Sequence, residues 1–266
     1  DNKSAVTVVM TVLENLTPEH RHGDIVVAFV PDEEVGLRGA KALDLSRFAV
    51  DFAWTIDCCE LGEIVYENFN AAAAEIRFTG VTAHPMSAKG VLVNPLLMAA
   101  DYISHFDRLQ TPEHTAGREG YVWFNGIQGD QNSTLLQASI RDFDSESFLR
   151  RKQQIGDVAE KIAAQYPTAS VEFSIGDTYS NISNAIGDDR RAIDLMFEAM
   201  ESIGVTPKPM PMRGGTDGAA LSAKGLLTPN FFTGAHNFHS KFEFLPLRAF
   251  EASYHTAFQL CLLAAR

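Results

Sequence analysis

The fold is decided by the stretch Asp24-Ile-Val-Val-Ala-Phe-Val-Pro-Asp-Glu-Glu-Val-Gly36. Residues 25–30 are a continuous apolar run bounded by turn residues, which is typical of a strand buried on both faces of a parallel sheet. Three carboxylates follow directly after Pro31. Because ligands and catalytic groups in open α/β sheets gather at the carboxyl ends of strands, this stretch predicts a sheet with a site at its edge.

Helical and strand patterns alternate on both sides of this stretch, up to residue 68 and again after residue 181. The predicted helices cover residues 4–13, 188–203 and 247–265, and the predicted strands cover residues 24–30, 51–57, 63–66 and 229–233. This alternation predicts an α/β fold, with a mixed, mostly parallel sheet flanked by helices.

The middle of the chain has a different order of elements. Its predicted strands and helices cover, in chain order, residues 72–79, 94–109, 120–124, 135–142, 145–166 and 169–175. The resulting order βαββαβ is typical of an α+β, ferredoxin-like sandwich. We therefore expect one domain made of residues 1–68 and 182–266, and an inserted domain made of residues 69–181.

Composition and charge narrow the class of protein. The 266 residues are 45% hydrophobic and 21% charged, as in a soluble globular protein with a sizeable core. The net charge of −12 argues against a nucleic-acid binder and against an anionic membrane surface as partner. Three cysteines without framework spacing fit a reducing cytoplasm. The chain starts at Asp1 on a helical pattern, so we expect it to be part of a longer polypeptide.

The adjacent acids Glu33 and Glu34 are the strongest chemical signal. Two glutamates at a strand end can have different roles, because one can bind a cation while the other transfers protons. The alternative is a solvated turn that opens a helix, where the helix dipole favours acids. Asp57 ends the next predicted strand and can reach the same edge, although an aspartate there is more often a turn residue.

Other candidates are weaker by themselves. His236 and His239 follow the predicted strand 229–233 and stand too close together for spacing to choose between them. The turn Arg213-Gly-Gly-Thr-Asp-Gly218 suits a carboxylate or phosphate cradle, or is a plain glycine-rich turn. Asp1 by itself indicates a helix N-cap, and His84 and Arg141 can be surface residues. Carboxylates and a histidine at several strand ends form the mixed oxygen and nitrogen set that suits zinc.

Taken in order, the motifs resemble the peptidase T family of di-zinc exopeptidases over essentially the whole chain. They are Asp1-Asn-Lys, Pro31-Asp-Glu-Glu-Val-Gly36, Tyr66-Glu-Asn-Phe-Asn-Ala71, His84-Pro, Ala88-Lys-Gly90, Ile140-Arg-Asp-Phe-Asp144, Arg213-Gly-Gly-Thr-Asp-Gly218, and Phe232-Thr-Gly followed by His239. Related families include glutamate carboxypeptidase, the aminoacylases and succinyl-diaminopimelate desuccinylase. The resemblance implies a zinc exopeptidase-like fold whose inserted domain is a lid.

The resemblance also implies roles. Asp1 would bridge two zinc ions, with Glu34 as ligand of one ion, and Asp57 as ligand of the other. His239 would be the C-terminal histidine ligand, and Glu33 would be the general base.

In the inserted domain, His84 would stabilise the oxyanion, and Arg141, together with Arg213, would hold a substrate terminus or carboxylate. In related enzymes the histidine that corresponds to His84 often comes from a partner subunit, which favours a homodimer through the lid.

Two departures from the family pattern bear on the metal site. In the family pattern an early strand carries a His-x-Asp motif, which supplies one zinc ligand and its orienting aspartate, and we expect this motif to lie upstream of Asp1. Cys58-Cys59 replaces glycines after Asp57, and these thiols could perturb the site or bind metal adventitiously.

The sequence thus predicts a cytoplasmic zinc aminopeptidase that acts on short peptides, with a tripeptide as the implied substrate. One alternative is a dipeptidase or N-acyl amino acid amidohydrolase of the same clan, and another is a non-catalytic fragment that uses the fold for binding. We expect Asp1, Glu34, Asp57 and His239 to converge with Glu33 beside them.

Overall fold

The computed structural model describes residues 2–57 and 59–266. The chain divides into two compact units. Unit 1 comprises Asp1–Asn68 and Ser180–Arg266, and unit 2 comprises Phe69–Tyr179. The boundaries expected from the sequence lie after residues 68 and 181. Asp1 and Cys58, which both figure in the predicted metal site, lie outside the described residues.

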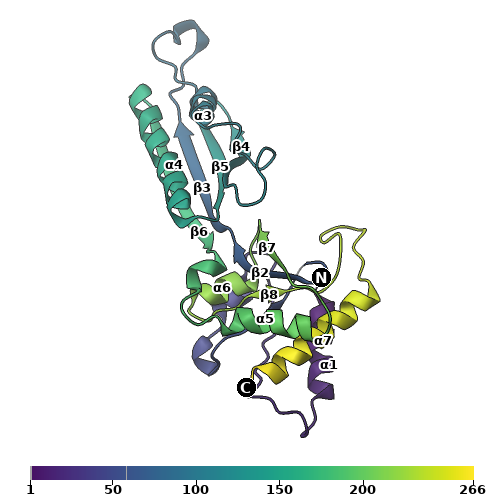
Figure 1. The fold of residues 1–266 in the computed structure, drawn as a ribbon. Helices are drawn as coiled ribbons and strands as arrows, with labels where there is room; N and C mark the ends of the chain where they lie inside the picture. The colour runs from purple at the N-terminus through teal and green to yellow at the C-terminus, as the bar shows by residue number, and fades with distance from the viewer. Residues whose placement is uncertain (1, 58) are drawn as a thin grey trace. The chain divides into compact units, whose positions relative to one another are not determined.

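Unit 1 contains a four-stranded mixed sheet (Figure 1). Its strands are β1 (Thr55–Ile56), β2 (Glu63–Asn68), β7 (Lys208–Met212) and β8 (Asn230–Phe231). They lie in the order β1-β8-β2-β7, with parallel pairs β1–β8 and β2–β7 and an antiparallel pair β2–β8. The expected mixed sheet is confirmed, although β1 and β8 are shorter than the predicted strands.

Helices surround this sheet. In chain order they are α1 (Lys3–Asn15), α2 (Arg38–Ala42), the 3₁₀ turn η1 (Leu45–Arg47), the 3₁₀ turn η3 (Ile182–Ala185), α5 (Arg191–Ser202), α6 (Asp217–Ala223) and α7 (Leu247–Leu263). Helix α7 packs against both α1 and α5. On α1, Val8 and Val12 lie one turn apart and are buried in the core, as an amphipathic helix requires.

Residues 24–30 differ from the prediction. They form no strand, and three of their apolar side chains are exposed: Val26 by 47%, Val27 by 36% and Phe29 by 57%. A strand is stabilised by hydrogen bonds to a neighbouring strand, and β1, β2, β7 and β8 pair only with one another within the described part of the chain. The apolar run therefore has strand-like composition without a strand partner here.

Unit 2 has the predicted order βαββαβ. Its elements are β3 (Asn70–Thr79), the 3₁₀ turn η2 (Pro85–Ser87), α3 (Pro95–Ser104), β4 (Tyr121–Gly129), β5 (Ser133–Asp142), α4 (Ser145–Gln165) and β6 (Ser170–Tyr179). The four strands form an antiparallel sheet in the order β4-β5-β3-β6. In order of appearance this is strand order 2-3-1-4, which is that of a ferredoxin-like sandwich.

One face of the unit 2 sheet carries the core. On β3 the side chains alternate, with Ile76 and Phe78 fully buried and Glu75 and Arg77 exposed. Helices α3 and α4 cover the buried face. Tyr102 on α3 is fully buried and donates its hydroxyl to the carbonyl of Ile155 on α4 at 2.9 Å, so the buried phenol is satisfied.

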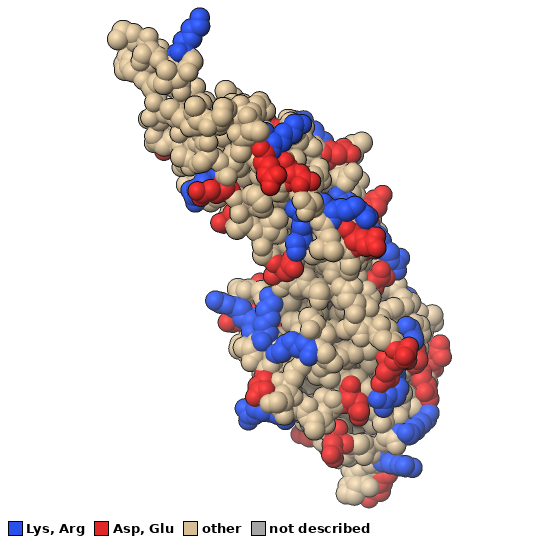
Figure 2. All heavy atoms as spheres, turned by 90° about the vertical axis from the view of Figure 1, so that its left-hand side faces the viewer, with Lys and Arg blue, Asp and Glu red and all other residues tan. Residues whose placement is uncertain are grey.

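Charges of both signs are mixed on the face of the molecule that Figure 2 draws. Figure 2 shows basic and acidic side chains interspersed on the face in view, rather than a broad patch of one sign. On α4, for example, Arg150 lies 3.5 Å from Glu146 and 3.9 Å from Asp144. Across residues 2–57 and 59–266, no helix combines the length and the apolar composition needed to cross a membrane.

Candidate metal and catalytic site

Glu33 and Glu34 lie in a tight turn that leads into α2. Asp32, Gly36 and Leu37 have positive φ angles of 62°, 107° and 58°, so the backbone reverses sharply around the two acids. The amide of Leu37 donates to the carbonyl of Glu33 at 2.9 Å. A Cβ on Gly39 would lie 2.3 Å from the carbonyl oxygen of Pro31, so only glycine allows this approach. The turn opens a helix, as the alternative interpretation proposed, and it also fixes both acids in place.

Asp57 follows β1 and is held by two asparagines. Its amide donates to Asn230 Oδ1 at 2.9 Å, and Asn230 Nδ2 donates back to its carbonyl. Asn230 is fully buried on the neighbouring strand β8. Asn2, which caps α1, donates Nδ2 to the carbonyl of Ile56 at 2.8 Å and to Asp57 Oδ1 at 3.5 Å. Sheet and helix together therefore place the Asp57 carboxylate.

The structure separates the two histidines that the sequence left equivalent. His239 Nε2 lies 2.9 Å from Glu34 Oε1. His236 instead pairs its Nδ1 with Glu60 Oε1 at 3.1 Å and stacks on Phe244, with ring centroids 5.0 Å apart. His239 therefore contacts the predicted metal ligand Glu34, whereas His236 contacts Glu60 and Phe244.

A fourth acidic residue, Asp217, joins the site although sequence reasoning passed over it. It is the first residue of α6 and lines the same pocket as Glu33 and Asp57. In the glycine-rich turn Arg213–Gly218, the arginine and the backbone amides are the features that predict anion binding. The acid inside this turn, directly before a short helix, was the signal that could have pointed to Asp217.

The carboxylates repel one another. Burial, with the nearby charges of Asp57, Asp217 and Glu34, raises the pKa of Glu33 to about 7. Burial, followed by the charges of Asp217 and Glu34, raises the pKa of Asp57 to about 6. Burial also raises the pKa of Asp217 to about 6. These acids form a negatively charged cluster that favours protonation, or a cation, over full ionisation.

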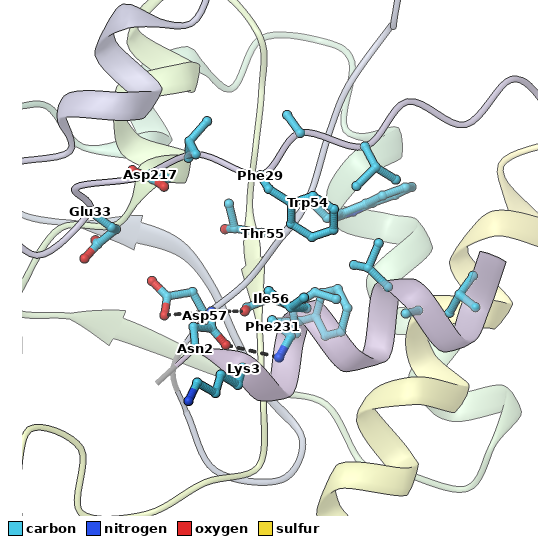
Figure 3. Close-up of a pocket in the computed structure, with 18 of the residues that line it drawn as sticks. Asn2, Lys3, Phe29, Glu33, Trp54, Thr55, Ile56, Asp57, Asp217 and Phe231 are labelled. Carbon is cyan, nitrogen blue, oxygen red and sulfur yellow. Dashed lines mark hydrogen bonds between the residues drawn. The ribbon is translucent and has the colours of Figure 1, made fainter. Parts of the chain in front are cut away.

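The pocket beside these acids has a volume of about 630 Å³. Figure 3 shows Glu33, Asp57 and Asp217 at one end of it, coming from three different segments. At the other end lie apolar side chains, among them Phe29, Trp54 and Phe231. The pocket therefore has an acidic end and an apolar end.

The donor set fits a divalent metal in its chemistry. Glu34 and His239 stand together, Asp57 interacts electrostatically with both, and carboxylate and imidazole are common zinc ligands. The charge cluster would also be relieved by a dication. Within the part of the chain that the structure describes, no three histidine, cysteine, aspartate or glutamate side chains come close enough to hold an ion. The described residues thus bring together only the pair Glu34–His239, with Asp57 as a further neighbour.

The other three predicted site residues are His84, Arg141 and Arg213, of which the first two lie in unit 2. In unit 2, His84 is exposed and caps η2, its Nδ1 accepting from the amide of Met86 at 3.2 Å. Arg141, also in unit 2, donates Nη1 to the carbonyls of Ala72 and Ile140 and lies over the ring of Tyr179. Arg213 lies half-buried in the turn before α6. The acids and His239 all belong to unit 1.

The raised pKa values predict how stability depends on pH when no divalent metal is present. Glu33, Asp57 and Asp217 bind protons more tightly in the folded chain, with pKa values of about 7, 6 and 6, than in an unfolded chain, where carboxylates titrate near about 4. Their stabilising contribution is complete below about pH 4 and is lost as pH rises to about 7. Over this range, the melting temperature in chelator should therefore change less favourably with rising pH in the wild type than in Asp57→Asn. The same pH dependence in both proteins would contradict the prediction.

Comparisons with known proteins agree with this fold. A peptidase T-like protein of Yersinia pestis is 66% identical over 266 residues, which is all of this chain and 65% of that protein. The chain therefore spans about two thirds of that relative's length. Aminopeptidase PepT of Bacillus cereus has a similar structure, with a TM-score of 0.88 at 21% identity, covering 100% of this chain and 71% of that one.

A second solved structure is a dinuclear metal-binding peptidase of the M20 family from Bacillus subtilis. It aligns with a TM-score of 0.71 at 18% identity and covers 98% of this chain and 70% of that one. Similarity at this level of identity shows a shared fold. The model of peptidase family M20/M25/M40 matches residues 1–262. Because this match covers almost the whole chain, the protein belongs to peptidase family M20/M25/M40.

Proposed function

We propose that this chain carries the greater part of a zinc-dependent aminopeptidase that removes the N-terminal residue of short peptides, tripeptides above all. Membership of a peptidase family supports hydrolysis of amide bonds, and the names of the relatives in Yersinia pestis and Bacillus cereus support the choice of an exopeptidase. The observation that supports the proposal is that two neighbouring acids have different surroundings. Glu34 contacts His239 at 2.9 Å, whereas Glu33 has its pKa raised to about 7.

Four residues would hold the metal: Glu34, Asp57, His239 and Asp1, the last of which lies outside the described residues. The dinuclear peptidase from Bacillus subtilis supports a site for two ions. Two zinc ions bound there would polarise the scissile carbonyl and lower the pKa of water.

Glu33 would act as general base and then as general acid. A carboxylate with a pKa of about 7 is partly ionised at neutral pH, so it can accept the proton of the attacking water. It can then deliver that proton to the amine that leaves. His84 would donate to the oxyanion, and Arg141 and Arg213 would bind a charged end of the substrate.

Unit 2 would serve as a lid and as the surface of a homodimer. Its antiparallel sheet and two helices form a core of their own, which suits a domain that moves as a body. Sedimentation of the whole protein, and of a variant without Phe69–Tyr179, tests the dimer. A shortened variant that still forms dimers would contradict this role.

Removal of metal tests the proposed chemistry. We expect dialysis of the whole protein against a chelator to abolish hydrolysis of tripeptides, and addition of zinc to restore it. The reason is that the proposed mechanism depends on zinc held by Glu34, Asp57 and His239. The 266-residue chain by itself should be inactive or very weak, since it spans only 65% of the length of the peptidase T-like relative. Metal content and initial rates are measured on the same samples. Full activity in chelator would refute the metal-dependent mechanism.

A substrate panel separates the proposed peptidase from its closest alternative. Tripeptides with free N-termini should be cleaved, whereas N-acyl amino acids and dipeptides should be poor substrates. The reverse order would identify an amidohydrolase of the same family. No hydrolysis of any amide by the zinc-loaded whole protein would favour a binding function.

A further inference from the structure

Buried side-chain oxygens without a hydrogen-bond partner concentrate at one place in unit 1. They are Thr55 Oγ1, Thr216 Oγ1 and Asp217 Oδ1. Over residues 2–57 and 59–266, the other such atoms are His105 Nε2 and Thr134 Oγ1, both in unit 2. Buried polar groups are almost always paired with protein or with ordered water. Three unpaired oxygens from neighbouring segments therefore point to a shared partner.

Gly218 shows how the two hydroxyls converge. A Cβ on this glycine would lie 3.2 Å from Thr216 Oγ1 and also 3.2 Å from Thr55 Oγ1. The hydroxyls reach this point from β1 and from the residue that precedes α6. The same Cβ would lie 2.3 Å from the carbonyl oxygen of Thr228, so no larger residue fits. Glycine thus allows both hydroxyls and the Thr228 carbonyl to approach this stretch of backbone closely.

Asp217 completes the set. It stands between Thr216 and Gly218 in the chain, and Figure 3 shows its carboxylate on the same side of the pocket as the Thr55 hydroxyl. Thr216 is only 2% exposed, so solvent outside the protein does not satisfy its hydroxyl. None of the three oxygens has a hydrogen-bond partner among the described residues.

We propose that one buried water molecule bridges Thr55 Oγ1, Thr216 Oγ1 and Asp217 Oδ1. Such a water would donate one hydrogen to the carboxylate and one to a threonine oxygen, and would accept the hydroxyl hydrogen of the other threonine. Three polar partners are the usual number for a buried water. A hard cation such as Ca²⁺ takes six to eight oxygen ligands, which is more than these side chains provide.

The bridge would tie together two elements of the candidate site. Thr55 lies on β1, Asp57 follows this strand two residues later, and Asp217 begins α6. The water would therefore hold the Asp217 carboxylate in the pocket that it shares with Asp57 and Glu33. This inference goes beyond the proposed function, because it requires neither metal nor substrate. If the bridging water is not found, the proposed function is unaffected, and if the proposed function is wrong, the bridging water is unaffected.

Substituting valine for threonine tests the bridge by the sign of its effect on stability. If the water is present, Thr55→Val and Thr216→Val each break a hydrogen-bonded network and should lower the melting temperature by about 2–4 °C. The double variant should lose less than the sum, because either change already releases the same water. If the hydroxyls were truly unpaired, their removal would raise the melting temperature and overturn the proposal.

The two tryptophans of these 266 residues allow each unit to be followed separately in this chain. Trp54 lies in unit 1 and Trp123 in unit 2, so a Trp123→Phe background leaves Trp54 as the reporter of the bridge variants. Thr134→Val is the matched control, followed by Trp123 in a Trp54→Phe background. Thr134 is fully buried, and its hydroxyl has neither a partner nor a second such oxygen near it. Its removal should leave the melting temperature unchanged or raise it, and a fall equal to that of Thr216→Val would overturn the inference.

Two further measurements identify the bridging species directly. A crystal structure that resolves ordered water should show one molecule within hydrogen-bond distance of all three oxygens, and it should be lost in Thr216→Val. Melting temperatures in potassium, sodium and choline chloride of equal ionic strength should agree. A rise specific to potassium or sodium that disappears in Thr216→Val would replace the water by an alkali cation and overturn the proposal.

Discussion

Glu33→Gln in the whole protein should lower kcat by about 10²–10⁴-fold while the zinc content stays unchanged. Glutamine has almost the same volume as glutamate but cannot accept a proton from water. Glu34, Asp57 and His239, which are proposed to hold the ions, remain in place. Because Glu33 would act in both proton transfers, we expect a loss near the upper end of this range. Steady-state rates on a tripeptide and metal analysis of the same sample measure the two effects.

The neighbour Asp32 offers a matched control for this substitution. It is exposed, lies in the same turn with a φ of 62°, and its side chain lies 4.0 Å from that of Arg38. Asparagine tolerates positive φ well, so Asp32→Asn should keep nearly the full rate. If Glu33→Gln retained more than about a tenth of the wild-type kcat, well outside the range for general acid–base catalysis, the general-base assignment would have to be abandoned.

Phe78→Ala should destabilise unit 2 by about 3–5 kcal/mol. Phe78 is fully buried on β3 and packs edge-to-face on Tyr102, with ring centroids 5.5 Å apart. Its removal loses apolar burial and leaves a cavity between the sheet and α3. For a domain of this size the melting temperature should fall by roughly 10 °C or more. Fluorescence of Trp123 on β4, in a Trp54→Phe background, follows the transition of this unit.

Arg77→Ala is the control on the same strand. Arg77 precedes Phe78 and points to the exposed face of the sheet, so its loss should change stability by no more than about 0.5 kcal/mol. Equal effects of the two substitutions would contradict a core on only one face of this sheet.

Unit 2 shows what a local pattern can predict. The alternation along β3 and the helical spacing along α3 and α4 indicate the element types, and β3 to β6 lie within one continuous segment. Their partners are therefore contained in the same stretch of sequence. Residues 24–30 show the opposite case, because an apolar run predicts a buried strand only where another strand pairs with it. The described residues provide no such strand.

The candidate site also combines residues that the sequence could indicate with residues that only the structure could identify. Glu33 and Glu34 could be singled out because two acids directly after an apolar run are unusual. Asp217 was missed because a lone acid before a short helix resembles an ordinary turn. The choice between His236 and His239 could not be made from spacing, since the two are three residues apart. Their side chains reach different partners only in the folded loop.

The sequence by itself determined the types of the elements of unit 2, the three long helices α1, α5 and α7 of unit 1 and, through its motifs, the family, because periodicity and short motifs are properties of neighbouring residues. Only the tertiary structure decided that His239 meets Glu34, across 205 residues of chain, and that Asp217 shares a pocket with Asp57. It also decided that Thr55 and Thr216 converge beside Gly218. Such meetings depend on how strands pair and helices pack, so they follow from the energy of the whole fold rather than from any local stretch.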